Sequence, residues 1–113
     1  MNRYTVDQIV AAVEHATCLT FSEIVGRERC KPVMRARQLM AYTLYTLCIR
    51  PLSYPDVAAY MCRKRTNHAT QILRCKSAKK MLENPSEAGE QFRQLLAEVI
   101  QHADAASCTK AGV

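Results

Sequence analysis

The sequence has few of the residues that interrupt helices and few that stack on bases. Its 113 residues include three glycines, four prolines, no tryptophan and only 6% aromatic residues. The low aromatic content argues against a stacking platform for single-stranded nucleic acid. No apolar run approaches the roughly 18 residues of a membrane span. No apolar stretch follows the charged start either, so we expect neither a membrane segment nor a secretory signal.

A chain of this length has room for one domain with one core, which excludes a two-domain enzyme or a dinucleotide-binding fold. Its 49% of hydrophobic residues excludes a disordered basic tail. The six cysteines include no Cys-x-x-Cys pair and match no zinc spacing. Because no secretory signal is present, we expect reduced thiols in a cytoplasmic protein, with no metal and no cofactor.

Charge is unevenly distributed along the chain. The net charge is +6, but residues 27–80 include thirteen basic and two acidic residues, whereas the two flanks together include three basic and eight acidic residues. The middle segment therefore carries +11 and the flanks carry −5. This segregation indicates that the middle of the chain is a binding surface for a polyanion.

Apolar residues recur at helical spacing along nearly the whole chain, and no strand-like alternation persists. This pattern predicts an all-α fold of about six helices. Helix starts are expected at the capping boxes Thr5-x-x-Gln8 and Thr20-x-x-Glu23, near Pro32, at Ser53, at Thr66 or Asn67, and at Asn84 followed by Pro85. Residues 1–103 are expected to form one helical domain. Residues 104–113 are small, polar and without period, which predicts a disordered tail.

Two of the expected helices, 53–61 and 67–82, are joined by a basic turn and have helix-turn-helix proportions. Ala69, Ile72, Cys75 and Leu82 are expected to pack inward. The opposite face is then polar, and its residues are Asn67, Thr70, Gln71 and Arg74. Asn and Gln bond the adenine edge and Arg bonds the guanine edge in the major groove. A polar helix face is more often only solvated, so this face by itself leaves both interpretations open.

A second basic cluster precedes and begins the third expected helix. Arg27, Arg29 and Lys31 fall in the loop, and Arg35 and Arg37 follow in the first turns, where they are expected to face solvent. Such a loop reaches a narrow minor groove or clamps phosphates while a recognition helix lies in the adjacent major groove. The alternative for each residue taken alone is a charge that only aids solubility. Two clusters of the same sign favour DNA.

Three motifs resemble the C-terminal DNA-binding domain of the bacterial replication initiator DnaA, a six-helix domain with a Trp-repressor-like fold. Residues 27–38 are similar to its basic loop and the helix start that follows. Residues 53–57, Ser-Tyr-Pro-Asp-Val, are similar to its Ser-Leu-Pro-Glu-Ile opening. Residues 67–70, Asn-His-Ala-Thr, stand where the family has Asp-His-Thr-Thr. The resemblance covers about residues 5 to 100.

The resemblance implies roles for individual residues. Arg29, or next Lys31, stands at the position of an arginine that enters the minor groove. Asn67, His68 and Thr70 match residues that read bases, and Arg65 matches the arginine ahead of that signature. Asn both donates and accepts where the family's Asp only accepts, so a different base preference is expected. The chain has no Gly-x-x-x-x-Gly-Lys sequence, and we expect it to bind no nucleotide.

These observations predict a sequence-specific double-stranded DNA-binding protein that regulates transcription or replication initiation. Base readout is expected from Asn67, His68, Thr70, Gln71 and Arg74, and backbone or minor-groove contact from Arg27, Arg29, Lys31, Arg35, Arg37, Lys64 and Arg65. The alternative is a protein-interaction adaptor of the same fold that binds an acidic partner and has lost DNA binding.

An enzyme is not expected, because no nucleophile-and-base spacing is found and no acid is placed to orient a histidine. The expected partner is double-stranded DNA, with a second DNA-bound regulator or a second copy of the chain as open alternatives. A stand-alone domain of this kind fits a phage, a prophage or a bacterial accessory factor. Its expected location is the bacterial cytoplasm, in association with the nucleoid.

Overall fold

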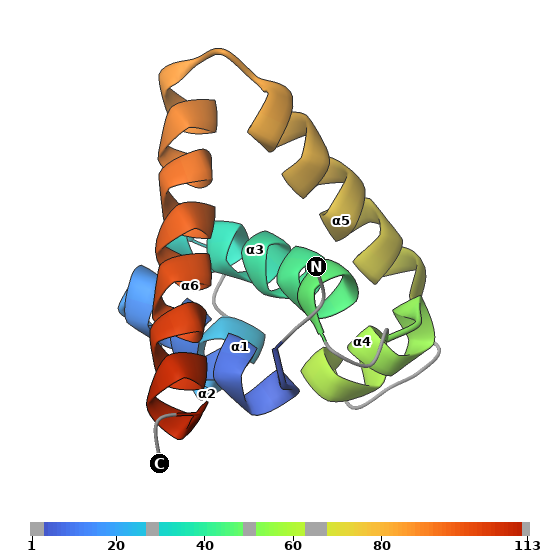
Figure 1. Ribbon diagram of the computed structural model, residues 1–113. Coiled ribbons are helices and arrows are strands. Elements are labelled where there is room, and N and C mark those ends of the chain that lie inside the picture. Colours follow the sequence, from blue (N-terminus) through green and yellow to red (C-terminus); the bar gives the residue numbers. More distant parts are fainter. Residues whose placement is uncertain (1–3, 27–29, 49–51, 63–67, 112–113) are drawn as a thin grey trace.

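The computed structural model describes residues 4–26, 30–48, 52–62 and 68–111. Over these residues the chain is all-α, with six helices and no strand (Figure 1). This confirms the predicted all-α fold of about six helices. The helices are α1 (Val6–Thr17), α2 (Phe21–Val25), α3 (Lys31–Leu47), α4 (Tyr54–Cys62), α5 (His68–Glu83) and α6 (Glu87–Ala111). No helix within these ranges is long and apolar enough to cross a membrane.

Three helix starts are fixed by reciprocal side-chain and backbone hydrogen bonds. The predicted capping boxes of α1 and α2 are confirmed: Thr5 pairs with Gln8, and Thr20 pairs with Glu23. At the start of α4, the Asp56 amide donates to Ser53 Oγ at 3.3 Å, and the Ser53 amide donates to Asp56 Oδ2 at 3.2 Å. Each pair satisfies backbone donors that a helix start leaves without an intrahelical partner.

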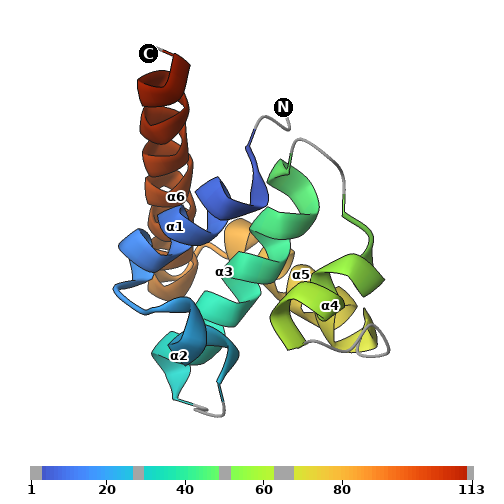
Figure 2. The ribbon, with the colours of Figure 1, turned by 90° about the horizontal axis from the view of Figure 1, so that it is seen from below.

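α3 is the central helix of the fold. It packs against α1, α2, α4 and α5, while α6 covers the other side of α1 (Figures 1 and 2). As their helical spacing predicts, apolar residues form the buried faces of α1, α3 and α6. The largest buried apolar side chains are Ile9 and Val13 of α1, Ile24 of α2, Leu39, Met40 and Leu44 of α3, Val57 of α4, and Phe92 and Val99 of α6.

Tyr4 connects the beginning of the described chain to two distant elements. Its side chain is buried, and its amide donates to the Leu47 carbonyl at 3.3 Å. Its hydroxyl donates a hydrogen bond to the Asp104 carboxylate of α6. The N-terminal segment is therefore held between the end of α3 and the C-terminal half of α6.

The C-terminal segment differs from the expectation of a disordered tail. α6 continues as a helix through Ala111. Ala103 is buried, and Asp104 accepts the hydrogen bond from Tyr4, so this part of the helix is anchored to the rest of the fold. Alanine also has the highest helix propensity, and residues 103–106 include three alanines.

The turn between α5 and α6 also differs from its prediction, which placed the helix cap at Asn84. The helix starts at Glu87, and Ser86 supplies the cap because its Oγ accepts from the Gly89 amide at 3.4 Å. Asn84 instead folds the turn by accepting from the Ser86 amide at 2.9 Å. A Cβ atom at Gly89 would lie 2.1 Å from the Asn84 carbonyl oxygen, so the turn requires glycine there.

Candidate nucleic-acid interface

α4 and α5 form a packed pair that is attached to the core through α3. Both helices contact α3, and they contact each other. Val57, Ala58 and Met61 of α4 are buried, as are Cys75 and Ala78 of α5. The pair therefore has a fixed orientation relative to the rest of the molecule, as Figure 1 shows.

The inward face of α5 is not the one that the sequence predicted. Gln71, Cys75 and Ala78 are buried, at spacings of four and three residues that define one helical face. The expected outward position of Gln71 is therefore wrong, because this side chain is 0% exposed. The expected inward position of Ala69 is also wrong, because Ala69 is exposed. Cys75 was placed correctly.

The exposed face of α5 combines apolar and basic side chains. It comprises Ala69, Leu73, Lys76 and Lys80, which follow one another at helical spacing. Leu73 is 64% exposed, the most exposed of the large hydrophobic side chains within the described part of the chain. Leu73, Lys76 and Lys80 were not predicted as functional residues. The sequence contains no clear signal for them, because the apolar residues of α5 do not form a single stripe and the buried face includes the polar Gln71.

The remaining predicted base-reading residues have mixed outcomes. Thr70 and Arg74 are half-buried, and Arg74 Nη1 donates to Gln71 Oε1 at 3.2 Å. His68 is the first residue of α5, but its side chain lies outside the described part of the structure. The predictions for Arg27, Arg29, Lys64, Arg65 and Asn67 also fall on residues outside that part.

Arg37 has a structural role instead of the solvent-facing position that was expected. Its Nε donates to the Ile24 carbonyl at 2.6 Å, and its Nη2 donates to the Gly26 carbonyl. These two carbonyls are at the C-terminal end of α2, where a helix leaves acceptors without intrahelical donors. The guanidinium thus fixes α2 against α3.

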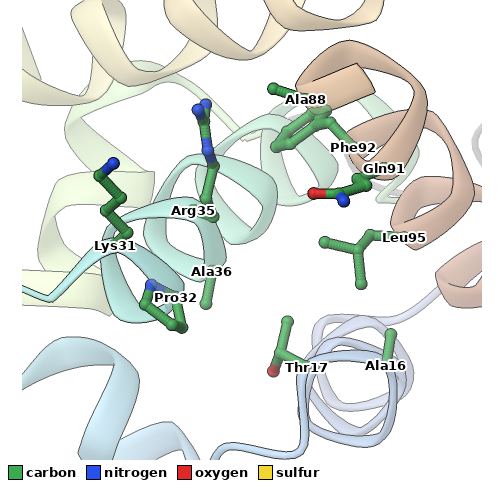
Figure 3. Close-up of a pocket in the computed structure, with 10 residues that line it drawn as sticks. All are labelled: Ala16, Thr17, Lys31, Pro32, Arg35, Ala36, Ala88, Gln91, Phe92 and Leu95. Carbon is green, nitrogen blue, oxygen red and sulfur yellow. The ribbon is translucent and has the colours of Figure 1, made fainter.

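Lys31 and Arg35 occupy one side of the first turns of α3, four residues apart. They line a cavity of about 430 Å³ between α1, α3 and α6 together with mostly apolar side chains. Figure 3 shows both long side chains pointing the same way, and Pro32 and Ala36 pointing toward Thr17. Arg35 is half-buried and its Nη1 contacts Gln38 Oε1 at 3.5 Å, while Lys31 is exposed. This side of α3 therefore presents two cations.

In Figure 2 the N-terminal end of α3 lies at the lower left and that of α5 at the lower right. The N-terminal end of a helix carries a partial positive charge from its aligned peptide dipoles. Cys30 makes no side-chain cap at the start of α3. The positive end of α3 thus reinforces the charges of Lys31 and Arg35 beside it.

The cysteines differ in exposure and acidity. Cys18 and Cys30 are exposed free thiols, whereas Cys48 and Cys75 are buried free thiols. Burial raises the pKa of Cys48 above its usual value and raises the pKa of Cys75 to about 11. The two buried thiols are therefore protonated near neutral pH and are poor nucleophiles. Among the described residues, no group of three Cys, His, Asp or Glu side chains is arranged to bind a metal ion.

No protein-family model matches the chain, and no curated protein matches it. Its function is therefore inferred from its residues and their arrangement.

Proposed function

We propose that this chain is a sequence-specific binding protein for double-stranded DNA and a regulator of transcription or of replication initiation. In this proposal α4 and α5 act as a helix-turn-helix, with α5 in the major groove. The start of α3 and the basic residues before it contact the backbone and the adjacent minor groove. The observation that carries the proposal is the face of α5 formed by Ala69, Leu73, Lys76 and Lys80, because it is exposed while the opposite face is buried in the fold.

The composition of that face suits duplex DNA. Small and apolar side chains such as Ala69 and Leu73 contact the methyl group of thymine, which marks the A·T pair in the major groove. Lys76 and Lys80 provide ammonium groups for the phosphates on either side of the groove. Burial of Cys75 and Ala78 holds the helix in a single orientation, which base readout requires.

The basic cluster of α3 supports the same conclusion. Lys31 and Arg35 lie on one side of α3 at its N-terminal end, where the helix dipole adds partial positive charge. Residues 27–80 carry a net charge of +11, which favours a polyanion over a neutral partner. The resemblance of three motifs to the DnaA DNA-binding domain supports duplex DNA among the polyanions.

The structure modifies the set of residues to which we assign contacts. Gln71 is removed from base readout because it is buried, and Arg37 is removed from the backbone contacts because it binds carbonyls of α2. Ala69, Leu73, Lys76 and Lys80 are added. Thr70 and Arg74 are kept at the edge of the interface, since both are half-buried.

The first experiment measures binding of the whole chain to a fluorescent random duplex by anisotropy at several salt concentrations. A DNA-binding protein gives an affinity that falls steeply with salt, with a log–log slope of about −0.9 for each phosphate neutralised. Selection from random duplexes then gives the preferred site. Absence of duplex binding at low salt would contradict the proposal and favour the adaptor with an acidic partner. Binding without an enriched site would contradict sequence specificity.

A further inference from the structure

A groove of about 350 Å³ lies where the last turns of α3, the first turn of α4 and the middle of α5 meet. Its lining consists of three tyrosines, one threonine, one cysteine and two lysines: Tyr42, Tyr45, Thr46, Tyr54, Cys75, Lys76 and Lys79. None of these seven side chains is acidic. The groove therefore offers phenol hydroxyls and ammonium groups together.

Two of the tyrosines form a fixed pair. The rings of Tyr45 and Tyr54 stack with centroids 4.2 Å apart and planes 5° from parallel. Tyr45 is at the surface, while Tyr54 is half-buried. Burial and the neighbouring Tyr45 phenol raise the pKa of Tyr54 to about 12. Both the stacking and the protonated state keep a hydroxyl donor in place at physiological pH.

We propose that this groove binds a phosphate group of the DNA backbone, next to the segment of duplex read by the exposed face of α5. The inference rests on the function proposed above. Phosphate oxygens accept hydrogen bonds from tyrosine hydroxyls and lysine ammonium groups in many protein–DNA complexes, and ionised acceptors form the stronger bonds. Tyr54 and Tyr45 are the hydroxyl donors here, and Lys76 and Lys79 supply the charge.

The location of the groove favours a backbone phosphate over a free one. Lys76 belongs both to the groove and to the exposed face of α5, so the two surfaces are continuous. In helix-turn-helix proteins the first helix crosses the DNA backbone while the second lies in the groove, and Tyr54 is the first residue of α4. Asp56, the acid in this turn, does not line the groove and accepts a hydrogen bond from the Ser53 amide.

The chain provides matched controls for both kinds of donor. Lys79→Gln removes a charge from the groove, whereas Lys80→Gln removes a charge from the exposed face of α5 outside the groove. Tyr54→Phe removes a hydroxyl from the groove, whereas Tyr60→Phe removes one from the exposed part of α4, where Tyr60 contacts Phe21 edge-on at 5.4 Å. Melting temperatures of all four variants establish that each one folds.

Binding to the selected duplex is measured by anisotropy over a range of salt concentrations. We expect Lys79→Gln and Lys80→Gln each to weaken binding and to reduce the salt slope by about 0.9, because each removes one phosphate contact. Only Lys79→Gln should be non-additive with Tyr54→Phe, because only Lys79 shares its phosphate with Tyr54. We expect Tyr54→Phe to weaken binding roughly tenfold, as for one lost hydrogen bond to a charged acceptor, while Tyr60→Phe has little effect. A duplex with one neutral methylphosphonate at the contacted position should remove most of the difference between Tyr54→Phe and the wild-type chain.

The outcomes separate this inference from the proposed function. If the wild-type chain binds duplex DNA and both groove variants bind equally well, the groove inference is overturned and the proposed function remains. If the wild-type chain binds no duplex at low salt, the proposed function is wrong, and so is the assignment of the phosphate to a DNA backbone. In that case inorganic pyrophosphate is titrated into the chain while the amide NMR signals of Tyr54 and Lys79 are recorded. This experiment tests whether the groove binds a free phosphate. Shifts confined to the groove support a free phosphate ligand, and unchanged signals overturn phosphate binding there.

Discussion

The guanidinium of Arg74 donates a hydrogen bond from Nη1 to Oε1 of Gln71 at 3.2 Å, and Gln71 is completely buried. The amide lies on the face of α5 that is turned toward the rest of the fold, the same face that buries Cys75 and Ala78 in the following turns. A buried amide is tolerated only where its hydrogen bonds are formed. Gln71 therefore orients α5, and Arg74 is partly committed to that task.

We predict that Gln71→Ala destabilises the chain, because it leaves a cavity and removes the acceptor of Arg74. The expected loss is about 1–3 kcal/mol of unfolding free energy. Urea unfolding followed by circular dichroism measures it, with the half-buried Ser77→Ala on the same helix as the control. A Gln71→Ala chain as stable as the wild type, with altered base preference, would instead place Gln71 in the DNA interface.

The two arginines at the start of α3 should separate stability from binding. Arg37→Ala removes hydrogen bonds to the carbonyls of Ile24 and Gly26, so we expect a loss of about 1.5–3 kcal/mol in unfolding free energy. Arg35→Ala should leave stability nearly unchanged, weaken duplex binding and reduce the salt slope by about one. Thermal melting and anisotropy on the same two variants measure both quantities. Equal melting temperatures would contradict the capping role of Arg37.

Helix starts were predictable because their interactions are local in sequence. The boxes of Thr5 with Gln8 and of Thr20 with Glu23 join residues three apart, so the pattern contains both partners. The apolar stripes of α1 and α3 are also regular enough to indicate their buried faces. Before α6, both Asn84 and Ser86 are suitable cap residues. Ser86 caps the helix because its Oγ accepts from the Gly89 amide, and the Asn84 carbonyl lies so close to Gly89 that only glycine fits there.

The orientation of α5 could not be derived in this way. Its apolar residues do not form a single stripe: Leu73 is 64% exposed, while the polar Gln71 is 0% exposed. Burial of Gln71 depends on the surroundings that α3 and α4 provide, and these are separated from it in sequence. The same limit applies to Arg37, whose acceptors lie eleven and thirteen residues away, and to Tyr4, whose acceptor Asp104 is at the other end of the chain.

Stability should fall in alkaline solution because of groups whose pKa is raised in the folded state. Burial raises the pKa of Cys75 to about 11, and burial together with the neighbouring Tyr45 phenol raises that of Tyr54 to about 12. The unfolded chain releases these protons at lower pH than the folded chain does. The stabilisation is therefore complete below about pH 9 and decreases as the pH rises toward 11 and then 12.

Urea unfolding at about pH 8 and about pH 10 tests the contribution of Cys75. The wild-type chain should lose stability between these two values, and Cys75→Ala should lose less. Cys18→Ala, in which the removed thiol is exposed, should behave like the wild type. An identical pH dependence in all three chains would show that ionisation of Cys75 is not linked to folding.

Leu73 gives the sharpest test of how α5 reads DNA. A leucine that is 64% exposed contributes little to the stability of the fold, so Leu73→Ala should leave the melting temperature unchanged. It should weaken binding to the selected duplex by about 1 kcal/mol and relax the preference at one A·T position, because a contact with the thymine methyl group is lost. Uracil in place of that thymine removes the same methyl group from the DNA.

The protein change and the DNA change form a double-mutant cycle. If Leu73 contacts the methyl group, uracil weakens binding by the wild-type chain but has almost no effect on Leu73→Ala, since the contact is already absent. Repeating the substitution at each thymine of the site locates the contacted base pair and thus the register of α5 in the groove. Equal effects of uracil on both chains at every position would show that Leu73 does not read thymine.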